Sequence, residues 1–221
     1  MGLALEVGIL ADLKTADEEG YEYFREQFSL LNELLTENQL PAHSEPEEIP
    51  LFSCDMYGYS GLHYLRRIAA HLLVNRTMPA PCAGQPNDDP MMHECYDEIA
   101  TMQDARSSDW KRFDHLLCHS DAEGFYVPVD FAEVLFDLND KGLAGAQVGS
   151  SAKLLAECTT LANALELPTH LDPDDNVFFG AAENQGHGSG WQRYGIECYA
   201  CIRLIHAARH SLKHGAAIVF T

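Results

Sequence analysis

The stretch from Phe113 to Phe131 reads F-D-H-L-L-C-H-S-D-A-E-G-F-Y-V-P-V-D-F, and the fold prediction starts from it. Successive side chains of a strand point to opposite faces of a sheet. In the second half of the stretch, one face would carry four large apolar residues, which are Phe125, Val127, Val129 and Phe131. This alternation predicts a strand.

The first half of the stretch predicts a second arm, so that the whole forms a β-hairpin. Residues 113–119 would be the first arm, and the polar residues 120–123 with Gly124 would form the turn, because glycine adopts positive φ without strain. Pro128 cannot donate a hydrogen bond to a neighbouring strand. The second arm is therefore expected at a sheet edge or at a bulge.

Part of this stretch, H-L-L-C-H-S-D-A-E-G-F-Y-V-P-V-D-F, resembles a run found in a family of uncharacterised bacterial proteins. Three further segments are similar to the same family: M-G-L-A-L-E-V-G-I-L-A-D-L at the start, G-L-H-Y-L-R-R from Gly61, and H-G-A-A-I-V-F from His214. The resemblance implies a bacterial source and one intact domain. It implies no reaction, because no activity is assigned to that family.

The charge of the chain limits the partners it can have. The 221 residues are 46% apolar, which is ample for a core, and carry a net charge of −20. A nucleic-acid-binding protein needs a basic face, so we expect no nucleic acid as a partner, and binding to an anionic membrane is disfavoured for the same reason. A basic protein is the partner that this charge favours.

The cysteines and the first residues indicate a cytoplasmic protein. The seven cysteines are scattered and odd in number, and Glu6 interrupts the first apolar run, so no secretory signal is recognised. No apolar stretch is long enough to span a membrane. The charge is also uneven, since residues 1–50 hold 12 acidic and two basic residues.

Apolar periodicity and capping residues predict about five helices. They are expected over residues 17–37, 61–74, 90–102, 151–165 and 191–214. Residues 3–10 and 216–220 are expected to be strands. We predict an α+β fold with a mixed sheet, in which the central hairpin and the two terminal strands are packed by these helices. No linker is evident, so residues 1–221 are expected to be a single domain.

One candidate site lies within the opening stretch. Cys118 next to His119 suggests a cysteine nucleophile with a histidine base, and the candidate catalytic residues are His115, Cys118, His119 and Asp121. Neighbours on a strand point to opposite faces, so the base would have to come from another element. The alternative is a buried Cys118 beside a hairpin tip rich in polar caps.

A second candidate site combines two basic helix faces. The candidate ligand-binding residues are His63, Arg66, Arg67 and His71 from one helix and Arg203 and Arg209 from the last helix. If the two faces converge, they could bind an anionic ligand. If they diverge, they only balance the acidic first helix.

Two patterns suggest metal ligands. His206 and His210 lie four apart on one helix face, where two histidines can bind zinc. A calcium-loop pattern places ligands at positions one, three, five and twelve, which here are Asp172, Asp174, Asn176 and Glu183. Val177 stands where that loop needs glycine. A polar helix face and an acidic helix cap are the respective alternatives.

Three classes of function are compatible with these observations. The first is a binding or regulatory protein, for example one of the immunity type, whose acidic face neutralises a basic partner. The second is a hydrolase that uses Cys118 or a histidine metal site, and the third is an anion-binding module. The binding or regulatory protein is placed first because of the charge, the size and the lack of a complete catalytic signature. The sequence indicates no particular cofactor.

Overall fold

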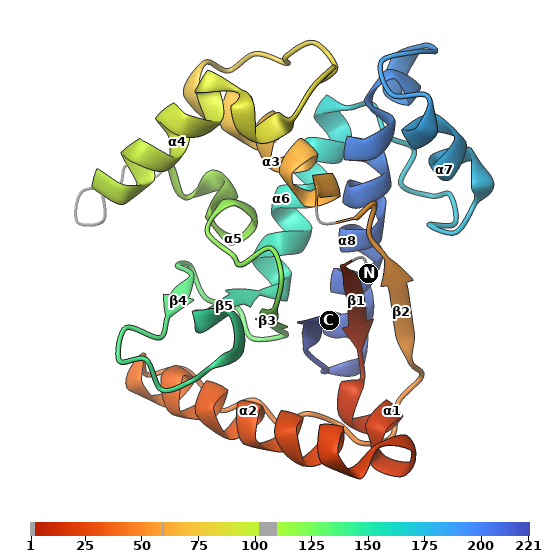
Figure 1. The fold of residues 1–221 in the computed structure, drawn as a ribbon. Helices are drawn as coiled ribbons and strands as arrows, with labels where there is room; N and C mark the ends of the chain where they lie inside the picture. The colour runs from red at the N-terminus through yellow and green to blue at the C-terminus, as the bar shows by residue number, and fades with distance from the viewer. Residues whose placement is uncertain (1–2, 59, 102–109) are drawn as a thin grey trace.

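The computed structural model describes residues 3–58, 60–101 and 110–221. Within these ranges the chain forms eight α-helices and a six-stranded mixed sheet, so the α+β prediction is confirmed (Figure 1). The strands are β1 (Ala4–Val7), β2 (Phe52–Asp55), β3 (Gly124–Val127), β4 (Leu135–Phe136), β5 (Gln147–Ser150) and β6 (Ile218–Phe220). The helices are α1 (Ile9–Ala16), α2 (Glu18–Glu37), α3 (Ser60–Val74), α4 (Pro90–Thr101), α5 (Asp114–Leu117), α6 (Ser151–Ala164), α7 (Asn176–Glu183) and α8 (Gly195–His214).

The sheet joins the two ends of the chain. The strand order is β2-β1-β6-β3-β5-β4, in which β3 and β5 run parallel and the other neighbours are antiparallel. Both terminal strands belong to the sheet, as the sequence predicts; β1 pairs with β6, and β6 then pairs with β3. The two ends of the chain therefore lie side by side in the interior of the sheet.

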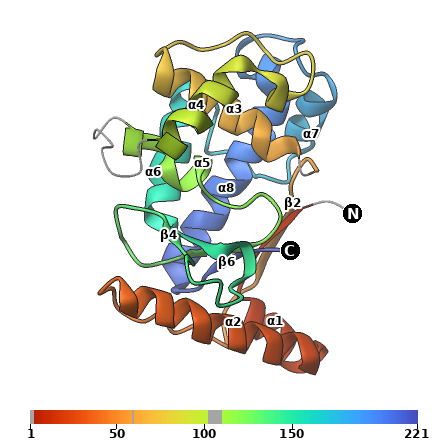
Figure 2. The ribbon, with the colours of Figure 1, turned by 60° about the vertical axis from the view of Figure 1, so that its left-hand side comes forward.

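Helices cover both faces of this sheet. Neighbouring residues of a strand point to opposite faces of the sheet and so belong to different apolar clusters. Tyr126 and Ile218 belong to the larger cluster, which includes residues of α3, α6 and α8. Phe125 and Val219 belong to the smaller cluster, which includes residues of α1 and α2. Figures 1 and 2 show α2 lying across one side of the sheet and the other long helices stacked on the opposite side. The protein therefore has three layers, with the sheet in the middle and α2 forming most of the thinner helical layer.

The predicted hairpin is wrong in its first arm. Residues 110–117 form a 3-10 turn followed by α5, and Phe113, Leu116 and Leu117 are buried at helical spacings of three and four. The carboxylate of Glu157 accepts the backbone N–H groups of His115 and Leu116 at 3.0 and 2.8 Å, which caps this short helix. A cap supplied by a residue 42 positions away cannot be recognised from the local pattern.

The second arm is a strand, but an interior one. β3 has β6 on one side and β5 on the other, so the predicted edge position is wrong. Pro128 lies just after the last residue of β3, where no ladder hydrogen bond is needed. The parallel partner β5 starts within the segment 141–149, for which the sequence predicts only a loop. Its Gly149 packs directly against the Tyr126 ring, because a Cβ there would lie 2.3 Å from that ring.

The long helices agree with their predicted positions. Asp17 caps α2 by accepting the N–H of Gly20 at 3.1 Å, Ser150 caps α6, and Gly215 ends α8 with φ 69°. α4 begins at Pro90 as predicted, whereas its expected end at Met102 lies outside the described residues. The strand predicted over residues 3–10 ends at Val7, because Ile9 and Leu10 begin α1. The short elements β2, β4, β5, α1, α5 and α7 are not among the predicted ones.

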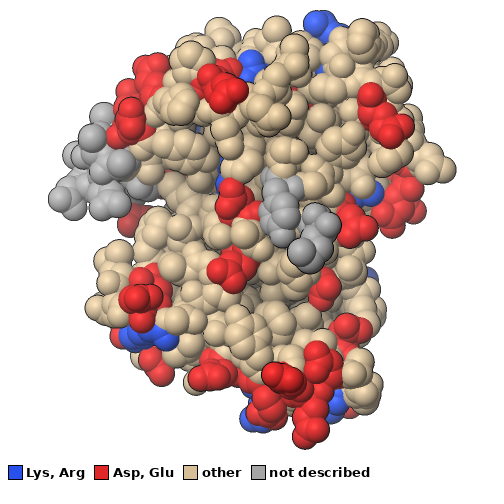
Figure 3. All heavy atoms as spheres, in the orientation of Figure 1, with Lys and Arg blue, Asp and Glu red and all other residues tan. Residues whose placement is uncertain are grey.

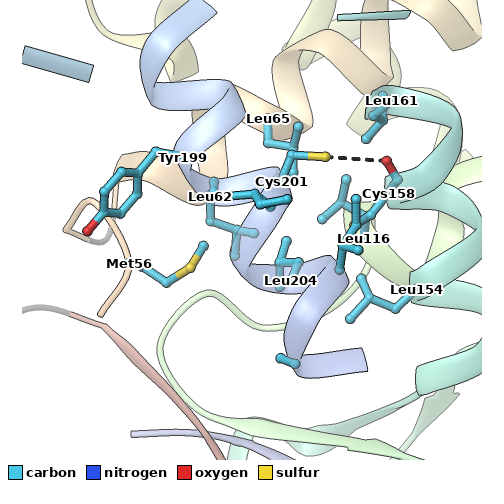
Figure 4. Close-up of a cluster of buried hydrophobic side chains, with 14 of the residues drawn as sticks. Met56, Leu62, Leu65, Leu116, Leu154, Cys158, Leu161, Tyr199, Cys201 and Leu204 are labelled. Atoms are coloured by element: carbon cyan, nitrogen blue, oxygen red, sulfur yellow. Dashed lines mark hydrogen bonds between the residues drawn. The ribbon is translucent and has the colours of Figure 1, made fainter. Parts of the chain in front are cut away.

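The large cluster also contains most of the buried cysteines. Figure 4 shows Cys158 and Cys201 among leucines of α3, α6 and α8, and the thiol of Cys201 donates to the carbonyl oxygen of Cys158 at 3.3 Å. Burial raises the pKa of Cys54 and Cys95 to about 12. These thiols are therefore core residues rather than nucleophiles. Across the described ranges, none of the helices is long and apolar enough to cross a membrane.

Candidate functional site: an acidic helix face

The outward face of α2 carries a stripe of carboxylates. The inward face buries Phe28, Leu31, Leu34 and Leu35 against the sheet. At about 100° per residue, six exposed glutamates fall within an arc of roughly 100° on the opposite side of the helix. We call this set the α2 stripe, and its members are Glu18, Glu19, Glu22, Glu26, Glu33 and Glu37.

The spacing of the α2 stripe approaches that of a DNA strand. The six carboxylates extend over 19 residue steps, which is about 28 Å of helix, so they average one negative charge per ~5 Å. One strand of B-DNA carries one charge per about 3.4 Å of axis. The helix thus presents an edge of unevenly spaced carboxylates, whose mean linear charge density is over half that of a single strand. Figure 3 shows acidic side chains gathered along the edge of the molecule formed by this layer.

Few cations offset the α2 stripe. Arg25 pairs with Glu22 at 3.2 Å, and Lys141 reaches Glu33 at 3.3 Å and Glu37 at 2.6 Å. These pairs are at the surface, where each contributes little to stability. Among the described residues, two cations pair with the six carboxylates, which leaves the stripe negative.

Burial withdraws basic and acidic side chains from the surface in equal numbers. Arg66 is buried and donates to the carbonyl oxygens of Leu116, His119 and Ser120, and Arg67 is buried and bonds Asp89. Among the described residues the buried charged side chains are Arg66, Arg67, Arg203, Asp114, Glu157 and Glu197. The excess of acidic residues, 34 against 14 basic ones, therefore remains at the surface.

Three of the four candidate catalytic residues line one cavity, which are Cys118, His119 and Asp121. In this cavity Asp121 accepts a hydrogen bond from His63 at 2.8 Å, and the buried His119 ring stacks on Tyr126 at 4.0 Å. His115 lies outside the cavity lining and accepts the N–H of Ser150 at 2.9 Å. Burial lowers the pKa of His115 and of His119 to about 4, so both imidazoles are neutral at neutral pH.

The two predicted basic faces have different partners. On α3, His71 and Arg67 bond Asp89, and this ion pair fixes the start of α4. On α8, the guanidinium of Arg203 lies 3.6 Å from the centre of the Tyr199 ring and contacts Asp174 at 3.5 Å, whereas Arg209 donates to Thr169. The first set therefore connects α3 to the start of α4 through Arg67 and His71, and to residues 116–121 through Arg66 and His63. The contacts of the second set hold the loop before α7. A shared anion site remains a prediction.

The predicted metal ligands are mostly engaged in local structure. His210 lies 2.7 Å from the carbonyl oxygen of Pro50, and Asp172 accepts the N–H of Asp174 at 3.0 Å. Asn176–Glu183 is the helix α7, so this segment does not form a calcium loop. Over the residues that the structure describes, no group of three or more histidine, cysteine or carboxylate side chains is placed to hold a metal ion.

The α2 stripe was not identified as a site from the sequence, although the signal was present. The apolar residues of α2 and its acidic first turn were recognised, but the later glutamates were not placed on the helix. Plotting all six at 100° per residue would have shown one continuous face.

Comparison with known proteins places the chain in a family. The model of the family described as "Putative DNA-mimic protein" matches residues 1–220. The chain belongs to this family. Neither the curated proteins nor the solved structures gave a match. The expectation of a family without an assigned reaction is thereby confirmed.

The family corrects the predicted function. The first expected class was a binding or regulatory protein, for example one of the immunity type, and the alternatives were a hydrolase and an anion-binding module. The family's description names a DNA mimic instead. The sequence argument set nucleic-acid function aside because the chain lacks a basic face. A protein that imitates DNA needs the opposite charge, so the acidic composition is the relevant signal. A basic protein as partner is compatible with the family.

Proposed function

We propose that this protein binds a DNA-binding protein by presenting carboxylates where that partner normally contacts DNA phosphates. The α2 stripe is the proposed contact surface. The observation that carries the proposal is the set of six exposed glutamates within one arc of a 20-residue helix, in a chain with a net charge of −20. The family's description supports the same function.

The packing of α2 suits a charged docking surface. Its inner face is anchored by fully buried Leu31 and Leu35, so the outer face is held on a rigid support. A rigid array of charges loses little conformational entropy on binding. Opposite charges on the two proteins would also steer their encounter and make the association rate fall with added salt.

A competition measurement tests this function. The tagged protein captures its partner from an extract of the source organism, and the partner is then purified and bound to labelled duplex DNA. Adding this protein should release the DNA in proportion to the amount added. A partner that does not bind DNA, or one that binds DNA and this protein simultaneously without competition, would contradict the proposal.

A further inference from the structure

An apolar groove of about 390 Å³ adjoins the carboxyl-terminal end of α2. It is formed by residues 38–40, which follow α2, and by residues 131–138, which include the edge strand β4. Figures 1 and 2 show this end of α2 beside β4 and the loop that follows it. The walls of the groove include the side chains of Leu40, Val134 and Phe136. The groove therefore lies at the end of the α2 stripe and differs from it in chemistry.

Leu138 lines this groove and is held in solvent by a well-anchored loop. It is 89% exposed, more than any other large apolar residue that the structure describes. Asp137 accepts the backbone N–H of Lys141 at 2.7 Å, and the Lys141 ammonium group pairs with two carboxylates of the α2 stripe. The side chain of Gln27, also on α2, accepts the N–H of Ala144 at 2.7 Å. An apolar residue fixed in this exposed position is typical of a surface that contacts another protein.

Carboxylates surround the groove. Glu133 lines it, and Glu37 and Asp137 directly precede two other lining residues, Asn38 and Leu138. Glu37 is also the last member of the α2 stripe, so the stripe and the groove form one continuous surface. An apolar centre with a charged rim is the usual composition of a protein interface. A rim of carboxylates favours a partner segment in which lysine or arginine flanks an apolar side chain.

The groove adds a kind of attraction that the carboxylates do not provide. Contacts between carboxylates and cations attract basic proteins in general, and they weaken as salt is added. Burial of one large apolar side chain adds an attraction that depends on the area removed from water rather than on charge. A partner with an apolar residue beside its basic surface would thus be distinguished from basic proteins that lack one.

We propose that this groove receives a large apolar side chain of the DNA-binding partner, flanked by lysine or arginine at the edge of the surface that contacts DNA. The inference rests on the proposed function, because the α2 stripe holds the same partner beside the groove. This contact has no counterpart in the phosphates of DNA, so it provides selectivity among DNA-binding proteins.

Two synthetic peptides of equal charge test the groove without the natural partner. Each is a short lysine peptide with one different central residue, which is phenylalanine in one peptide and serine in the other. Their affinities for the full chain are measured at low salt by fluorescence anisotropy. We expect the phenylalanine peptide to bind the wild type about fivefold more tightly, since partial burial of one aromatic side chain supplies a difference of this order.

Two variants of the groove and one matched control show where the preference arises. Leu138→Ser removes the exposed apolar side chain, and Ala132→Trp fills the groove from an exposed position. Each should reduce the preference for the phenylalanine peptide to less than about twofold. Phe179→Ser removes a 48% exposed aromatic residue from α7, which packs in the larger apolar cluster on the other side of the sheet, and should leave the preference unchanged.

Equal binding of the two peptides to the wild type would overturn the inference, as would a preference that both Leu138→Ser and Ala132→Trp retain. Neither result affects the proposed function, which fails if the wild type does not release DNA from the captured partner. If the wild type releases DNA and Leu138→Ser does so at the same concentration, the α2 stripe acts without the groove and the inference alone is wrong.

Discussion

α2 and α8 are each 20 residues long and cover opposite faces of the same sheet, yet their surroundings differ completely. α8 buries 14 residues and lies among α3, α6 and α7, whereas α2 buries five and leaves one whole side in solvent. α8 contains a buried glutamate, Glu197, while the six glutamates of α2 all face outward. The two helices therefore have separate tasks, since α8 supports the fold and α2 carries the surface charge.

This difference between α2 and α8 predicts which substitutions change stability and which change binding. Substitutions on α8 are expected to alter the free energy of unfolding, because they change packing in a dry core. Substitutions on the outer side of α2 are expected to leave folding almost unchanged and to alter binding. The following experiments test that separation, beginning with the largest effect.

Truncation of the α8 core should give the largest loss of stability. Leu204 is fully buried in the cluster drawn in Figure 4, so Leu204→Ala removes apolar contacts and leaves a cavity. We expect the free energy of unfolding to fall by about 3 kcal/mol in urea titrations. Glu26→Gln on α2 is the matched surface change and should shift it by less than about 0.5 kcal/mol. Similar losses for the two variants would contradict the separation of tasks.

The buried glutamate of α8 should make stability depend on pH. Burial raises the pKa of Glu197 to about 7, although Gln185 donates a hydrogen bond to it at 2.8 Å. The folded state therefore holds this proton more tightly than the unfolded chain, in which the pKa is near 4.5. Stability from this group is greatest below pH 4.5 and is lost as the pH rises to about 7.

Glu197→Gln removes this titration. Between pH 5 and 7.5 the free energy of unfolding of the wild type should fall by roughly 2 kcal/mol more than that of the variant. The measurement is urea unfolding at several pH values. Because Glu157 is also buried with a raised pKa, the difference between the two proteins, rather than either curve alone, isolates Glu197. Parallel curves would show that Glu197 does not titrate in this range.

The smallest effect on folding is expected from the α2 stripe itself. Glu26→Gln removes the repulsion between Glu26 and Glu22, which lie four residues apart on one helix face, and should stabilise the fold by about 0.3 kcal/mol at low salt. Added NaCl screens the same repulsion, so it should stabilise the wild type more than the variant. Thermal unfolding at two salt concentrations measures both. A clear loss of stability in the variant would mean that these glutamates have structural partners.

The long helices could be predicted from the sequence because their signals are local. α2 and α8 each carry an apolar pattern over many turns, and capping residues such as Asp17 and Gly215 mark their ends. The strands have only two to four residues, and their partners are distant in sequence. The error in residues 113–120 has the same cause, because the cap of α5 comes from Glu157.

The α2 stripe and the cavity lined by Cys118 differ in the same way. The α2 stripe can be derived from one helix once the glutamates are placed on it. The cavity combines His63, Tyr96 and Gln147 from three separate elements, so no local pattern could have predicted it. Its residues meet only because α3, α4 and β5 are brought together by the tertiary fold.

Binding of the captured partner to two triple variants tests the central claim most directly. One variant neutralises the α2 stripe with Glu18→Gln, Glu22→Gln and Glu26→Gln. The other removes the same charge from exposed sites outside α2, with Glu94→Gln, Glu123→Gln and Glu183→Gln. Both variants have the same net charge, so any difference in their affinity for the partner shows the effect of where the charges lie.

At constant ionic strength, we expect the α2 variant to bind the partner at least fivefold more weakly, since loss of three charge contacts costs roughly 1–3 kcal/mol. The matched variant should stay within about twofold of the wild type, a difference of ~0.4 kcal/mol. Equal weakening of both variants would show that overall charge rather than the α2 stripe drives binding. Unchanged binding by the α2 variant would place the contact surface elsewhere and contradict the claim.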